Sequence, residues 1–166
     1  GLPIFDPGIP AHTSTHSKLG IFPEIRKAEA KYMPVMLRQA LVDSGDWGVV
    51  RVLPEAQESA ELLVSGSILH SDGRRLELRI NARDATGAQW LDKVYTGNTT
   101  AADYPVQVSG DPYLDVYAQI ASDLLAVRQQ RSAKQLADIR HVALLRYASG
   151  LAPEVFASYL ALAPNG

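Results

Sequence analysis

The amino-acid sequence predicts an α+β fold, in which a mostly antiparallel sheet of four to five strands carries helices on one face. Residues 61–97 read as three successive strands joined by two short polar turns, so these strands pair as hairpins. Amphipathic helical stretches lie before and after this block. The third observation is a period-two alternation in 74–83, which indicates one buried and one solvated face. Its apolar members are Leu76, Leu78, Ile80 and Ala82.

The part before the hairpins predicts a short strand, a loop and a long helix. Residues 2–6 are apolar enough for a first strand, and residues 7–20 are rich in Pro, Gly, Ser, Thr and His, which is typical of a loop. Apolar residues then follow helical spacing over 23–44. Pro34 is expected to kink this helix, and Gly45 is expected to end it in a left-handed conformation.

Four further strands follow the first helix. Asp72-Gly73 is a hairpin signal, and a second turn is expected at 84–87. Gly66 lies in the middle of one strand, which indicates either a bulge or close packing of another backbone. The expected strands are 47–53, 62–70, 74–83 and 88–96.

The C-terminal part of the sequence predicts helices. Residues 112–129 carry a clean apolar stripe, and Ser132 with Gln135 forms a capping box for a third helix that ends near Gly150. Pro153 is expected to begin a short fourth helix. The element order is therefore β-α-β-β-β-β-α, followed by a helical appendage.

We divide the chain into a sheet domain at 1–130 and a helical extension at 131–166. The extension is more apolar than a free tail, so it must cover something. Three possibilities stay open for what the extension covers: the sheet itself, a second copy that binds through 132–162, or a flanking domain outside this sequence.

Composition excludes several classes of function. The chain has 166 residues and a net charge of −2, and no run of Lys or Arg forms the basic stripe that nucleic-acid binding requires. It has no cysteine, which excludes disulfides, thiol catalysis and cysteine-ligated metal. No apolar run reaches the length of a bilayer, so no transmembrane segment is expected.

His12 and His16 are the weak candidates for metal ligands. They are four residues apart with Asp6 nearby, but they lie in the Pro- and Gly-containing loop and lack a third ligand at suitable spacing. We therefore expect no metal, no cofactor and no catalytic residue.

Five aromatic residues are candidates for an interaction surface. Trp90 and Tyr95 belong to the last strand and differ in parity, so the sequence places them on opposite faces, with one in the core and the other exposed. The other three come from the apolar helical extension: Tyr147, Phe156 and Tyr159.

Two segments resemble a group of bacterial envelope proteins. Residues 62–68 (LLVSGSI) are similar to a strand of that group with the ending Gly-Ser-Ile, and residues 84–97 (DATGAQWLDKVYTG) are similar to its turn-and-strand pattern of Asp-x-Thr-Gly, Trp and Tyr-x-Gly. The group includes the curli-secretion lipoprotein CsgG, the lipoprotein activators of penicillin-binding proteins and the N-terminal domain of TolB. The resemblance covers residues 2–127, and it departs at the 7–22 loop and at the helices of 132–162.

This resemblance implies a non-catalytic interaction module that acts in envelope assembly or secretion and binds an envelope protein. It also implies a periplasmic location, with outer-membrane anchoring through a lipidated cysteine upstream of Gly1. Two alternatives stay open: a metal-binding protein or hydrolase that uses the 6–16 loop, and a structural domain of a larger envelope protein.

Overall fold

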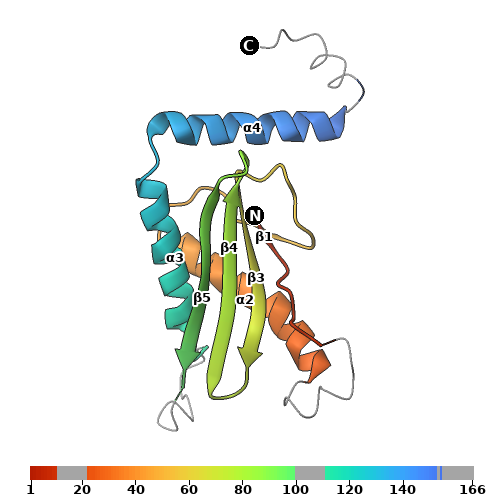
Figure 1. Cartoon of the computed structure of the whole chain (residues 1–166), viewed down its shortest axis with the longest axis vertical. Helices are drawn as coiled ribbons and strands as arrows, with labels where there is room; N and C mark the ends of the chain where they lie inside the picture. Colours follow the sequence, from red (N-terminus) through yellow and green to blue (C-terminus); the bar gives the residue numbers. More distant parts are fainter. Residues whose placement is uncertain (11–21, 100–110, 153, 155–166) are drawn as a thin grey trace.

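The computed structural model describes residues 1–10, 22–99, 111–152 and 154, and it has an α+β fold (Figure 1). Its main sheet has three antiparallel strands in the order β3-β4-β5. A separate pair of short strands, β1 and β2, is parallel. The strands are β1 (Leu2–Pro3), β2 (Val52–Leu53), β3 (Leu62–Ser71), β4 (Arg75–Asp84) and β5 (Gln89–Asn98).

Instead of one sheet of four to five strands, the described residues form these two sheets. The expected strand at 47–53 is reduced to β2, because its partner β1 offers only two residues for pairing. The N-terminal segment still borders β3: Val64 N donates to Gly1 O at 2.9 Å, and Asp6 N donates to Gly66 O at 2.8 Å. The pairing is irregular, since Pro3 has no N–H to donate.

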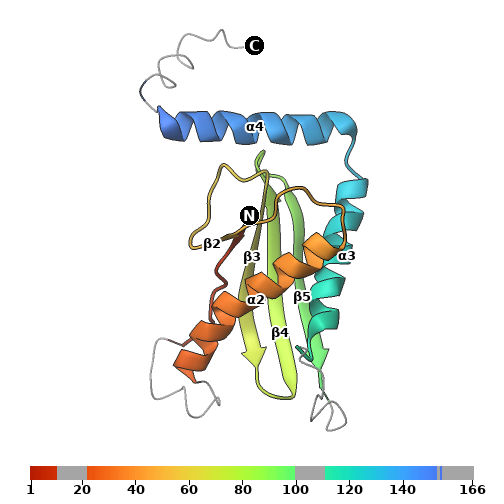
Figure 2. The ribbon, with the colours of Figure 1, turned by 180° about the vertical axis from the view of Figure 1, so that it is seen from behind.

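Two helices cover one face of the main sheet, as the sequence predicts (Figures 1 and 2). These are α2 (Pro23–Asp43) and α3 (Leu114–Gln129). The alternating side chains of β4 are fully buried against them. Helix α2 continues through Pro34, and Gly45 beyond its end has φ +72°, the left-handed conformation expected there.

The third helix, α4 (Ala133–Leu151), lies across one end of the sheet (Figure 1). Ser132 and Gln135 form the predicted capping box, in which Gln135 N donates to Ser132 Oγ at 3.1 Å. Ile139 and Ala143 attach the helix to the body, since both are buried. The helix runs one residue past Gly150, and the expected start of a fourth helix at Pro153 lies outside the described residues.

Trp90 and Tyr95 are both buried, so the prediction that they point to opposite faces is wrong. Ala82 pairs with Leu91, whereas the next residue of β4, Arg83, pairs with Gln89. Trp90 is therefore an extra residue in β5, and a β-bulge of this kind shifts the alternation by one position. The exposed fractions are 8% for Trp90 and 4% for Tyr95.

Across the described ranges, no helix combines the length and the apolar character needed to cross a membrane.

Candidate functional site

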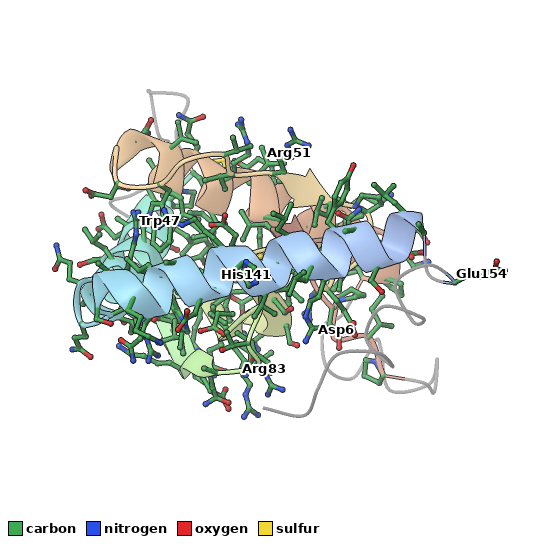
Figure 3. All side chains as sticks on the ribbon, turned by 90° about the horizontal axis from the view of Figure 1, so that it is seen from above. Asp6, Trp47, Arg51, Arg83, His141 and Glu154 are labelled. Atoms are coloured by element: carbon green, nitrogen blue, oxygen red, sulfur yellow. The ribbon has the colours of Figure 1, made fainter. Side chains whose placement is uncertain are left out.

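An open groove of about 580 Å³ lies beneath α4, between the body of the sheet and the connections on either side of β2. This volume is within the range of about 300–1,000 Å³ that is typical of small-molecule sites. Its floor is apolar, because the buried side chains of Leu41, Leu124 and Ile139 line it. Figure 3 looks down on α4 and shows Trp47 and Arg51 on one side of this helix, with Arg83 on the other. The groove is therefore on the α2 side of α4.

One end of the groove is bordered by a tryptophan–arginine cluster of Trp47, Trp90, Arg128 and Arg131, of which the first three line it. The two indole rings are 6.4 Å apart between centroids and tilted by 44°. The guanidinium of Arg128 lies 5.1 Å from the Trp47 ring, and that of Arg131 lies 5.5 Å from the Trp90 ring. Such cation–π contacts are favourable. Together they attach the corner between α3 and α4 to the α2–β2 connection and to β5.

Asp84 holds Trp90 in this cluster. Asp84 as a whole is only 7% exposed. Its carboxylate accepts hydrogen bonds from Trp90 Nε1 at 2.8 Å, Thr86 N at 2.8 Å and Ala88 N at 3.2 Å. Thr86 Oγ1 donates a fourth bond at 2.5 Å. Burial by itself raises the pKa of Asp84, but the hydrogen bonds outweigh it and leave the pKa below its ordinary value. Asp84 therefore stays ionised and fixes both the β4–β5 turn and the Trp90 indole.

The Trp47 indole differs from that of Trp90, because its Nε1 is buried without an acceptor in the described part of the chain. Trp47 lines the groove. A buried donor that makes no hydrogen bond costs about 1–3 kcal/mol.

The charged side chains that line the groove are mostly basic. Arg51, Arg128 and Arg140 line it, together with one acidic residue, Glu61. Arg51 and Arg140 are exposed, and neither has an ion-pair partner among the described residues. Guanidinium groups bind carboxylates and phosphates through paired N–H donors. The margin of the groove thus favours an anion.

Three of the five aromatic residues proposed as an interaction surface are described by the structure, and of these three Trp90 lines the groove. Tyr95 is in the core, where its hydroxyl donates to Asp123 at 2.7 Å, and burial together with this bond raises its pKa. Tyr147 is 57% exposed on α4. Phe156 and Tyr159 lie outside the described residues.

The candidate metal ligands His12 and His16 also lie outside the described residues. Asp6, their neighbour in sequence, accepts a hydrogen bond from Gly8 N at 2.8 Å. Within the described ranges, no three histidine or carboxylate side chains come together as a metal site.

The sequence did not point to Trp47, Arg51, Arg128 or Arg140 as members of one site. Trp47 and Arg51 lie in the α2–β2 connection, Arg128 lies near the end of α3 and Arg140 lies in α4, so no local motif contains them. The one available signal was Trp90 within the Asp84–Gly97 resemblance.

The lowered pKa of Asp84 predicts a loss of stability in acid. A carboxylate whose folded pKa is depressed contributes stability above its unfolded pKa, about 3.9, and this contribution is lost as the pH falls further. We expect the urea midpoint of the wild type to fall more steeply below about pH 4 than that of Asp84→Asn, which cannot ionise. Parallel curves for the two proteins contradict this role of Asp84.

Comparison of the chain with protein-family models, with curated proteins and with solved structures gave no match.

Proposed function

We propose that this chain is a non-catalytic binding module of the bacterial cell envelope and that the groove beneath α4 is its binding site. The single observation that carries the proposal is the lining of the groove: an apolar floor, two indole rings and arginines at the margin. Such side chains hold a ligand by burial, by hydrogen-bond donation and by charge. Arginine stays protonated and tryptophan only donates, so these groups are suited to binding rather than to proton transfer.

The envelope assignment rests on the resemblance of two segments, which form β3 and the β4–β5 turn with β5. The periplasmic location, the lipidated cysteine upstream of Gly1 and the role in assembly or secretion are parts of the same proposal. Asp84 and Trp90, both within the second segment, hold one end of the groove. The residues that carry the resemblance therefore also support the proposed site.

Photo-crosslinking in cells that produce the full protein tests this function. Val49 lines the groove and is 81% exposed, so a benzoylphenylalanine at this position can react with a partner bound in the groove. Ile25, exposed in the first turn of α2, is the matched control. We expect a defined adduct from position 49 and none from position 25. The adduct should disappear when Ala60→Trp narrows the groove.

An adduct that survives Ala60→Trp, or equal adducts from positions 49 and 25, contradicts the groove as the binding site. Circular dichroism establishes that the Ala60→Trp protein is folded. Stoichiometric metal in the purified protein that is lost in His12→Ala with His16→Ala would instead favour a metal-binding function of the 6–16 loop.

Self-association through 132–162 is a second proposal, favoured by the exposed side of α4. Leu144, Tyr147 and Leu151 are exposed there at spacings of three and four residues, the pattern with which two helices pack together. We expect light scattering to give a dimer for the wild type and a monomer for Leu144→Ser with Leu151→Ser. A monomeric wild type contradicts this proposal and leaves the groove unaffected.

A further inference from the structure

We propose that the groove beneath α4 binds a single-chain anionic amphiphile, a molecule with a carboxylate or phosphate group on an apolar chain. This inference rests on the proposed function, because it names the ligand class of the same groove. It follows from the order in which apolar and basic groups line the groove, from its floor to its margin.

The floor of the groove selects the apolar chain. Leu124 is fully buried, and Leu41 and Ile139 are nearly so, yet all three line the groove. No charged side chain among the described residues reaches this depth, since the lining arginines and Glu61 are exposed or half-buried. Burying apolar ligand surface against such a floor contributes roughly 25 cal/mol per Å², which favours a chain over a compact polar ligand.

The margin of the groove selects an anion. Arg51 directly precedes β2 and Arg140 belongs to α4, so the two line the groove from different elements. Neither guanidinium is engaged in an ion pair within the described part of the chain, so both are available to a carboxylate or phosphate. Glu61 is the acidic residue in the lining, and it leaves an excess of positive charge.

The indole of Trp47 supplies an independent indication. Its Nε1–H is buried and has no acceptor in the described residues. An oxygen of the anionic group is the kind of atom that satisfies this donor. The Nε1–H of Trp90 is not available to a ligand, because it already donates to Asp84.

Dodecanoate, dodecyl phosphate, dodecanol and acetate are the probes that separate the requirement for an anion from the requirement for an apolar chain. The two long-chain anions are used below their micelle concentrations, and dodecanol is used below its solubility limit. The chain has two tryptophans, and both line the groove, so tryptophan fluorescence reports binding directly. We expect saturable binding of dodecanoate or dodecyl phosphate, at least about tenfold weaker binding of dodecanol, and none of acetate. Whichever of the two anions binds more tightly identifies the head group.

The arginines are tested by Arg51→Gln with Arg140→Gln, for which we expect about tenfold weaker binding of dodecanoate. Arg83→Gln is the matched control, because Arg83 is also exposed but lies on the other side of α4 (Figure 3). The side chains of these arginines make no hydrogen bond or ion pair with other described residues, so we expect all variants to fold.

Equal binding of dodecanol and dodecanoate overturns the anionic requirement, and equal binding of acetate overturns the apolar one. If Arg83→Gln weakens dodecanoate binding as much as Arg51→Gln with Arg140→Gln does, the effect is one of general charge, and this result also overturns the proposal. If dodecanoate and dodecyl phosphate do not bind while the Val49 adduct forms with a polypeptide, the ligand class is wrong and the proposed function stands.

Discussion

Replacing Asp84 with alanine is expected to lower the free energy of unfolding by about 3–5 kcal/mol. The variant loses four hydrogen bonds to a buried carboxylate, and it leaves the Trp90 indole N–H buried without an acceptor. The backbone N–H groups of Thr86 and Ala88 belong to exposed residues and can turn to water, so the Trp90 donor accounts for much of the cost. Urea denaturation followed by circular dichroism measures the loss.

Asp92→Ala is the matched control for this experiment. Asp92 accepts two hydrogen bonds from Arg79, both at 2.9 Å, on the exposed face of the same hairpin. Exposed ion pairs contribute little to stability, so we expect a much smaller loss than for Asp84→Ala. Equal losses in the two variants contradict the view that Asp84 anchors this end of the groove.

Gly66→Val is expected to destabilise the protein by about 3–5 kcal/mol, comparable to removing a buried phenylalanine ring. A Cβ at position 66 would lie 2.9 Å from three ring atoms of Phe5. Phe5 is buried in the core and its segment borders β3, so the ring has to leave its place. Thermal unfolding and urea denaturation both report this change.

Gly48→Val is the control for the Gly66 substitution, because a Cβ at position 48 meets no atom within 4 Å. We expect this substitution to leave the free energy of unfolding almost unchanged. The double variant Phe5→Ala with Gly66→Val should lose clearly less stability than the sum of the two single variants, since they share one space. Strict additivity is the result that contradicts a direct clash.

The local periodicity in the sequence was sufficient to predict the main elements of the fold. The alternation from Leu76 to Ala82 indicates a strand with one buried face, and these side chains are fully buried in β4. Ser132 and Gln135 are close together in the sequence, so their capping box could be recognised directly. Gly66 was predicted to mark either a bulge or the close packing of another backbone. The backbone of Asp6 donates to Gly66 O at 2.8 Å, and a Cβ at position 66 would meet the side-chain ring of Phe5, which the prediction did not include.

The features that were missed depend on contacts between distant segments. The bulge at Trp90 arises from its register against Ala82 and Arg83, which period-two counting along β5 cannot reveal. Trp47 was assigned to a strand, whereas it packs on Trp90, 43 positions away. The groove escaped prediction for the same reason, because its arginines are brought together only by the placement of α4 over the sheet.

The two indole N–H signals in a ¹H–¹⁵N spectrum test the central claim most directly, namely that the groove beneath α4 is a binding site with an unoccupied donor. The chain has two tryptophans, so two signals are expected, and Trp47→Phe assigns them. On addition of dodecanoate, we expect the Trp47 signal to move downfield to saturation while the Trp90 signal, held by Asp84, stays almost unchanged. A Trp47 signal that remains fixed while the backbone signals of other surfaces move contradicts the groove as the site.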